Sequence, residues 1–217
     1  VSGGSVGAGT DTLLSIEGAI GSVFNDNLRG TLGDDVLDGN AGDDLLESRG
    51  GNDTLTGGDG RDTVTFGNQT SGLVLSLLNQ GVAQSTSLGL VTLVGVENLV
   101  GSGWNDTLTG DAGDNVLDGN LGNDTLDGGD GIDTASYATV FGGGVSVNLS
   151  LIGAQNTLTG GVDTLIGIEN LTGTINGDVL TGDAGANVLT GGSGVDTLIG
   201  GLGDDTLVGG DNTDFIV

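Results

Sequence analysis

The chain repeats a short pattern in which one aliphatic residue follows a glycine-rich polar loop. From Gly21 onward, five units of nine residues follow without a gap: GSVFNDNLR, GTLGDDVLD, GNAGDDLLE, SRGGNDTLT and GGDGRDTVT. Four more units follow from Gly101 and five from Gly173, in the same frame. The eighth position is aliphatic in all fourteen units, and the sixth is Asp or Asn. Such regularity predicts a repeat architecture.

The nine-residue period predicts a loop followed by a very short strand. Glycine at positions one, two and four permits positive φ and lets another backbone approach closely. The last three positions, such as Thr54-Leu55-Thr56, favour β structure but are too short to be stable alone. Such a strand is stable only when similar strands stack on it at about 4.8 Å. Two units then form one turn of a flat coil, in which each unit stacks on the unit two places along and the eighth positions meet inside.

This stacking brings the sixth-position side chains together in rows along the edges of the coil. Asp26 is expected near Asp44, and Asp35 near Asp53, because each pair is two units apart. The candidate metal ligands are Asp26, Asp35, Asp44, Asp53, Asp62, Asp106, Asn115, Asp124, Asp133, Asp178, Asn187, Asp196, Asp205 and Asp214. Backbone carbonyls are expected to assist them near Gly33, Gly42, Gly51, Gly60, Gly113, Gly122, Gly131, Gly185, Gly194 and Gly203.

Stacked carboxylates repel one another unless a cation lies between them. Flexible clusters of six to eight carboxylate and carbonyl oxygens suit Ca²⁺, whereas Mg²⁺ requires a stricter octahedron. Zinc and copper sites usually use His or Cys, and the sequence contains neither. The sequence therefore predicts calcium as the cofactor, and pairing units two apart within the three runs gives about eight ions.

Composition supports a cation as the partner of this chain. The formal net charge is −27, with only three Lys or Arg residues against thirty acids. Such a chain repels nucleic acid and anionic membranes. Eight calcium ions would bring the charge to about −11. No apolar run reaches the ~18 residues that a bilayer-spanning helix needs.

Two longer segments, 66–91 and 137–163, interrupt the nonapeptide frame and resemble each other. GLVLSLLNQGVAQ in the first matches GVSVNLSLIGAQ in the second, and a unit containing ENL follows each. Alternating residues such as Val145 and Val147 predict strands that continue the coil. We expect one continuous solenoid over 1–217, with nonapeptide runs at 12–65, 92–136 and 164–217. The alternative is that the insertions separate three short rolls.

The unit GGxGxD followed by x, an aliphatic residue and x resembles the RTX nonapeptide of type I-secreted bacterial proteins. It occurs cleanly as GGDGRDTVT, GGSGVDTLI and GGLGDDTLV, and almost so as GGDGIDTAS. The resemblance implies an all-β fold, a right-handed parallel β-roll or β-solenoid. It also implies calcium held between loops two units apart by sixth-position Asp side chains and loop carbonyls, and secretion to a calcium-rich exterior.

Three opening units depart from the motif at the fourth position. Phe24, Trp104 and Asn176 stand there in place of glycine, in the opening unit of each run. The sites that these loops join are therefore expected to be weaker. Asn115 and Asn187 at the sixth position still offer a neutral oxygen.

The sequence favours a structural binding module over an enzyme. Gly3 to Gly7 satisfy the G-x-S-x-G pattern of serine hydrolases, but the chain has no histidine to activate Ser5. One hypothesis is a calcium-folded segment of a secreted or cell-surface protein of adhesin, surface-layer or matrix type, with further repeat copies or surface components as partners. The alternative is the C-terminal roll of an extracellular protease, lipase or epimerase whose catalytic domain lies upstream. The closing Asp-Phe-Ile-Val resembles the end of type I secretion signals, or is the end of an ordinary unit.

Overall fold

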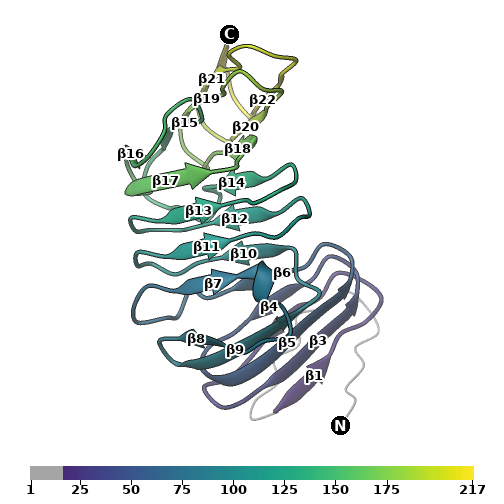
Figure 1. Ribbon diagram of the computed structural model, residues 1–217. Helices are drawn as coiled ribbons and strands as arrows, with labels where there is room; N and C mark the ends of the chain where they lie inside the picture. Colours follow the sequence, from purple (N-terminus) through teal and green to yellow (C-terminus); the bar gives the residue numbers. More distant parts are fainter. Residues whose placement is uncertain (1–16) are drawn as a thin grey trace.

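The computed structural model describes residues 17–217, and the described chain is a coil of short strands with loops at both edges (Figure 1). Residues 12–16 of the first run and the G-x-S-x-G pattern around Ser5 lie outside the described residues. Within 17–217 the single helical element is one 3₁₀ turn, η1 (Leu77–Asn79).

One side of the coil is a single nine-stranded sheet, called the long sheet below. All of its strand pairs are parallel, and each strand comes from a successive turn of the coil. In spatial order its strands are β2 (Asn27–Arg29), β4 (Leu45–Glu47), β6 (Thr63–Thr65), β10 (Asn98–Val100), β12 (Val116–Asp118), β14 (Thr134–Ser136), β18 (Asn170–Thr172), β20 (Val188–Gly192) and β22 (Thr206–Gly210).

The opposite side is divided into three sheets, called the first, second and third short sheets. The first contains β1 (Gly18–Ile20), β3 (Val36–Ala41), β5 (Gly51–Asp59), β9 (Gly89–Val94) and β8 (Gln84–Thr86). The second contains β7 (Val74–Ser76), β11 (Thr107–Thr109), β13 (Thr125–Asp127), β17 (Val162–Ile166) and β16 (Gln155–Asn156). The third contains β15 (Ser146–Asn148), β19 (Val179–Thr181), β21 (Thr197–Ile199) and β23 (Phe215–Ile216).

Stacked strands within the runs are offset by two nonapeptide units. Leu28 pairs with Leu46 in the long sheet, and Leu108 pairs with Leu126 in the second short sheet. Eighth-position residues thus lie directly above one another on both sides of the coil. The all-β fold of parallel stacked strands that the period predicts is confirmed.

The core is thin and consists mainly of these two facing aliphatic columns. Leu46, Leu55 and Leu117 are completely buried, and their neighbours on each strand face outward or lie at the edges. Phe66 and Tyr137, which begin the two insertions, are also buried and join the core. Because each three-residue repeat strand contributes one core side chain, stability depends on the stacking of many turns rather than on a thick interior.

Each insertion makes the chain leave one short sheet and begin the next. After β6 the chain forms β7, which starts the second short sheet, and then returns through η1 to the β8–β9 hairpin that ends the first. β10 then stacks on β6 in the long sheet. The second insertion repeats this path with β15, the β16–β17 hairpin and β18.

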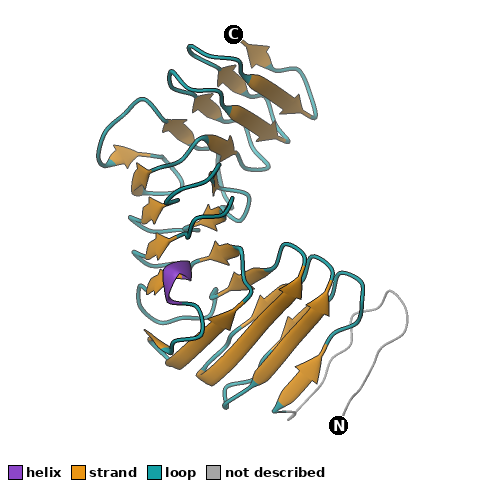
Figure 2. Cartoon of the chain, turned by 45° about the vertical axis from the view of Figure 1, so that its right-hand side comes forward, coloured by secondary structure: helices purple, strands orange, loops and turns teal. Residues whose placement is uncertain are grey.

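The short-sheet side therefore holds two extra strands at each insertion, while the long sheet continues without a break. Each extra strand occupies about 4.8 Å along the stack on one side only, so the coil must bend there. The parts built on the three short sheets are inclined to one another in Figure 2. Because the long sheet joins all three, we propose that residues 17–217 fold as one unit.

Hydrogen exchange in calcium tests this proposal at the second insertion. The backbone N–H groups of Leu149 and Val179 donate to the carbonyl oxygens of Thr181 and Val145, both at 2.9 Å. We expect these amides to exchange as slowly as those in β11 and β13, because they belong to the same cooperative unit. Fast exchange over Val145–Leu149 beside slow exchange in the runs would show instead that the insertions separate independent rolls.

Candidate metal sites along the loop edges

The structure arranges the sixth-position residues, together with Asp163, in one row along each edge of the coil. Most of these residues directly precede a strand, and Asp53 and Asp163 lie near the start of the longer strands β5 and β17. The long-sheet row contains Asp26, Asp44, Asp62, Glu97, Asn115, Asp133, Glu169, Asn187 and Asp205. The short-sheet row contains Asp35 and Asp53, then Asp106, Asp124 and Asp163, then Asp178, Asp196 and Asp214.

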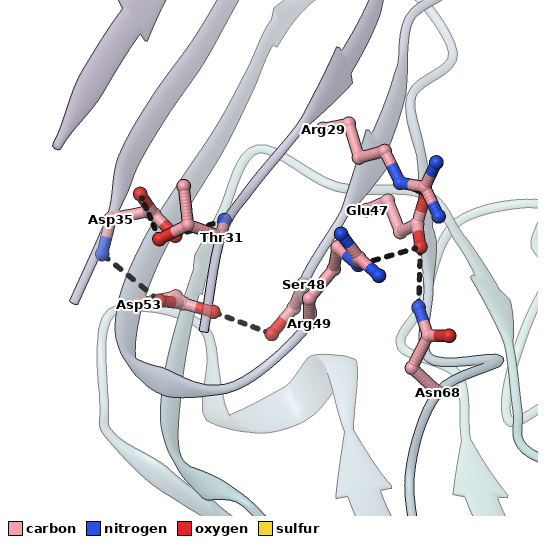
Figure 3. Close-up of polar contacts among 8 residues, drawn as sticks. All are labelled: Arg29, Thr31, Asp35, Glu47, Ser48, Arg49, Asp53 and Asn68. Carbon is pink, nitrogen blue, oxygen red and sulfur yellow. Dashed lines mark hydrogen bonds and ion pairs between the residues drawn. The ribbon is translucent and has the colours of Figure 1, made fainter. Parts of the chain in front are cut away.

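Hydrogen bonds along each row hold the carboxylates between successive turns. Oδ1 of Asp44 accepts from the backbone N–H of Asp26 at 2.7 Å, and Oδ1 of Asp62 accepts from that of Asp44 at 2.8 Å. Figure 3 shows the same contact at 3.0 Å from the backbone N–H of Asp35 to Asp53. The pattern recurs from Asp106 to Asp124, Asn115 to Asp133, Asp178 to Asp196, Asn187 to Asp205 and Asp196 to Asp214.

Most of these side chains are removed from solvent. Asp44 is 2% exposed, Asp62 and Asp133 are 0% exposed, and Asp26, Asp205 and Asp214 near the ends are half-buried. Burying an unpaired charge is strongly unfavourable. Desolvation is accordingly the largest cause that raises the pKa of Asp44 to about 6 and that of Asp124 to about 8. Neighbouring carboxylates, including Asp62 beside Asp44, raise the pKa further.

The second oxygen of each carboxylate divides the row residues into two groups. In the first group it accepts hydrogen bonds from a nearby Ser or Thr of the same loop. Thr31 donates through both its backbone N–H and its hydroxyl to Asp35, and the Ser48 hydroxyl donates to Asp53 at 2.6 Å (Figure 3). The same type of contact joins Ser22 to Asp26, Ser102 to Asp106 and Thr174 to Asp178.

In the second group the Oδ2 atom is buried and has no partner. Within the described residues these unpaired oxygens belong to Asp44, Asp62, Asp133 and Asp196. A buried carboxylate oxygen without a donor leaves its full desolvation penalty uncompensated. These four oxygens therefore require a cation or a hydrogen-bond donor that the protein itself does not supply.

Each unpaired oxygen shares its space with a backbone carbonyl. The Oδ2 of Asp44 and the carbonyl oxygen of Gly57 both lie within 3.0 Å of the point where a Cβ of residue 39 would stand. Glycine at the first position leaves that space open, and any side chain would collide with both oxygens. Gly95, Gly167 and Gly209 supply the corresponding carbonyls beside Asp62, Asp133 and Asp196.

These oxygens fit a hard cation that accepts mixed carboxylate and carbonyl ligands. Within residues 17–217 no group of three or more His, Cys, Asp or Glu side chains could hold a metal ion. Each site would thus combine the paired carboxylates of two turns with backbone carbonyls, which is the oxygen set that Ca²⁺ prefers. Two of the carbonyls beside the unpaired oxygens belong to the first-position glycines Gly57 and Gly209, and the other two belong to Gly95 and Gly167 in the units containing ENL. The sequence predicted that the carbonyls of Gly33, Gly42, Gly113 and Gly185 would bind calcium. Each of these carbonyl oxygens lies beside the fourth-position glycine of the unit two places further along the chain.

The structure also places residues in the rows that the sequence analysis did not select as ligands. Glu97 and Glu169 accept from the backbone N–H groups of Asp62 and Asp133, and Asp163 accepts from that of Asp124. The two glutamates stand in the sixth position of the units containing ENL, so the nine-residue period could have identified them as row residues. Asp163 falls outside the frame, but residues 161–166 read GVDTLI, which is identical to residues 194–199 around Asp196, and this local identity could have marked it.

The three opening loops with altered fourth positions all contain a capped carboxylate. Asp26, Asp106 and Asp178 accept from Ser22, Ser102 and Thr174 respectively. Trp104 is exposed and donates its indole N–H to the carbonyl oxygen of Gln69 at 3.2 Å. In these three opening units, the altered fourth position therefore coincides with a loop that satisfies its own carboxylate.

A comparison with protein-family models supports the same chemistry. The model described as the RTX calcium-binding nonapeptide repeat matches six segments, of which all but 100–135 overlap another: 20–55, 46–70, 100–135, 163–198, 172–207 and 190–217. Together they cover more than half of the chain and omit most of both insertions.

The chain belongs to the RTX calcium-binding nonapeptide repeat family. Its fold is the parallel β-roll of that family, and its repeats are calcium-binding repeats of the type found in secreted proteins. No curated protein matches the chain. Among the described residues, no helix has the length and apolar character to cross a membrane.

The raised pKa values of the RTX carboxylates predict how the calcium-free chain responds to pH. A carboxylate with a higher pKa in the folded state binds protons on folding, so stability falls as pH rises from the ordinary value of 3.8 to the raised one. At ~1.4 kcal/mol per pKa unit, Asp44 alone lowers the free energy of unfolding by roughly 3 kcal/mol across that window.

We therefore expect the dialysed, calcium-free chain to gain β structure at about pH 5 relative to about pH 8. Far-UV circular dichroism measured across this range checks the expectation. A spectrum that stays constant, or that loses β signal on acidification, would contradict the assignment of these carboxylates as buried and uncompensated.

Proposed function

We propose that this chain is a structural module of a secreted or cell-surface bacterial protein of the adhesin, surface-layer or matrix type, and that it folds when calcium fills its loop edges. The observation that carries the proposal is the set of four buried carboxylate oxygens without a partner, each beside a backbone carbonyl. The repeated topology of the two insertions supports a tandem structural role, because a large unit of the coil occurs more than once.

Calcium would be held by carboxylates of consecutive turns and by carbonyls of loop glycines. Asp44 and Asp62 with Gly57 form one such set, and Asp196 and Asp214 with Gly209 form another. Bound calcium supplies positive charge that compensates the buried carboxylates. The chain supplies the rigid spacing, since the backbone N–H of each turn fixes one oxygen of the next carboxylate along the row.

The energy available from calcium is comparable with the stability of a whole domain. Extracellular calcium modules often bind at ~10⁻⁴–10⁻³ M, and at ten times the Kd each site contributes ~1.4 kcal/mol. About eight sites would then contribute about 11 kcal/mol, against a typical domain stability of ~5–15 kcal/mol. Filling the sites therefore decides whether the chain is folded.

This dependence suits a protein that is exported before it folds. At the low calcium concentration of the cytosol, the −27 net charge and the exposed glycine-rich loops oppose compaction. At millimolar calcium outside the cell the same chain becomes a stiff rod. We infer that the chain stays unfolded during export and folds only outside the cell, where calcium is abundant.

A calcium titration tests the folding switch. We expect far-UV circular dichroism to change from coil to β cooperatively at about 0.1–1 mM calcium and to return to coil when chelator is added. Magnesium should have little effect, because it requires a stricter octahedral geometry. A β spectrum that persists unchanged in excess chelator would show that the aliphatic columns hold the coil without metal.

Substitution of single carboxylates tests how the sites are shared. Asp44 stands between Asp26 and Asp62 in its row and has an unpaired oxygen, whereas Asp26 begins the described row and is capped by Ser22. We expect Asp44→Ala to lose about two bound calcium ions and the matched Asp26→Ala no more than about one. Equilibrium dialysis with atomic absorption measures both counts, and equal losses would contradict the pairing along the row.

A further inference from the structure

We propose that each insertion carries a calcium site of its own, formed by Asp62 with Glu97 at the first and by Asp133 with Glu169 at the second. The inference rests on the proposed calcium-dependent function. It adds two sites to those counted by pairing units within each nonapeptide run, because each new site joins two different runs. It makes the long-sheet row continuous through both insertions.

A shortened turn brings each glutamate into the row. Between β9 and β10 the chain has only the three residues Gly95, Val96 and Glu97, where an ordinary unit has a six-residue loop. Gly95 adopts φ +56°, and Val96 is buried in the core at 0% exposure. This short loop ends in glutamate, whose side chain is one methylene longer than that of aspartate. The longer side chain therefore lets the carboxylate reach the row although the loop has fewer residues.

The second insertion builds the same turn from an independent stretch of sequence. Gly167 has φ +55°, Ile168 is buried, and Glu169 follows directly. Oε2 of Glu169 accepts from the backbone N–H of Asp133 at 2.8 Å, and Oε2 of Glu97 accepts from that of Asp62 at 2.9 Å. Each glutamate thus makes the contact that a sixth-position aspartate makes elsewhere in the row.

An unpaired buried oxygen points to a ligand at both places. Asp62 and Asp133 are each 0% exposed, and the Oδ2 atom of each has no hydrogen-bond partner. The carbonyl oxygens of Gly95 and Gly167 come from the short turns themselves and lie beside these Oδ2 atoms, in the space left by Gly57 and Gly128. Two carboxylates and a carbonyl therefore meet at each turn with no protein donor left for the Oδ2 atom.

The opposite edge of the second insertion shows the contrasting, metal-free arrangement. Asp163 accepts from the backbone N–H of Asp124, from the Thr157 hydroxyl at 2.7 Å and from the Tyr137 hydroxyl at 3.2 Å. Both oxygens of Asp163 are therefore satisfied by the protein. The first insertion has Val91 at the equivalent strand position and needs no such donors. The proposal accordingly extends to the two glutamate turns alone.

Native mass spectrometry of calcium-loaded chains tests the proposal by counting ions. Glutamine keeps the length of glutamate and an oxygen that can accept the same backbone hydrogen bond. Asn115 and Asn187 show that the row accommodates amides, since their side-chain oxygens accept from the backbone N–H groups of Asp111 and Asp183. We expect Glu97→Gln and Glu169→Gln each to bind one calcium ion fewer than the unaltered chain, and the double variant two fewer.

The matched control is Glu47→Gln, which also removes one negative charge but at a position outside the two rows. Glu47 pairs with Arg29 at 2.7 Å on the outer face of the long sheet (Figure 3) and should leave the calcium count unchanged. Full calcium counts in Glu97→Gln and Glu169→Gln would overturn the inference while leaving the proposed function intact. An unaltered chain that binds no calcium would overturn both.

A measurement on the unaltered sequence covers the case in which the variants do not fold. The chain contains only four glutamates, so ¹³C-carboxyl-labelled glutamate isolates Glu17, Glu47, Glu97 and Glu169 in the infrared spectrum. Replacing magnesium by calcium at saturation should shift the carboxylate stretch of two of the four. No shift in the folded, calcium-bound chain would overturn the inference.

Discussion

Burial of carboxylates between stacked loops is the interaction on which the rest of this structure depends. A nonapeptide coil can stack only if the sixth-position side chains of consecutive turns lie close together, and the stacking itself removes them from water. The backbone N–H of each turn holds one oxygen of each carboxylate. The other oxygen is either capped by a Ser or Thr or left without a partner, so the stability of the coil depends on what compensates it.

Other features of the sequence follow from this constraint. Glycine is required at the first position because the unpaired oxygen and the next carbonyl occupy the place of its Cβ, as at Gly39 and Gly191. The aliphatic residue at the eighth position fills a core only two side chains deep, so packing alone adds little per turn. The insertions bend the coil but leave the long sheet unbroken, and the short turns at Glu97 and Glu169 keep the row of carboxylates in register.

Much of this arrangement could be predicted from the nine-residue period, and the remainder could not for identifiable physical reasons. The pairing of Leu28 with Leu46 follows because identical units must stack identically. The path of the insertions depends on long-range pairing, such as Leu75 with Leu108, which no local pattern encodes. Capping of Asp53 by Ser48 depends on a hydroxyl five residues away whose rotamer the sequence does not show. Asp163 was missed because it enters the row through a hairpin, outside the repeat frame.

The most direct test of this account is to remove the uncompensated charges and ask whether calcium is still needed. In the chain carrying Asp44→Asn, Asp62→Asn, Asp133→Asn and Asp196→Asn, each row position keeps an acceptor oxygen, as Asn115 and Asn187 do naturally. Small-angle X-ray scattering of the calcium-free chains should give a radius of gyration of about 50 Å for the unaltered sequence, the value for an unfolded chain of this length. For the fourfold variant the account predicts a clearly smaller, rod-like value at the same pH. An equally expanded fourfold variant would contradict the claim that these four buried carboxylates are what makes folding depend on calcium.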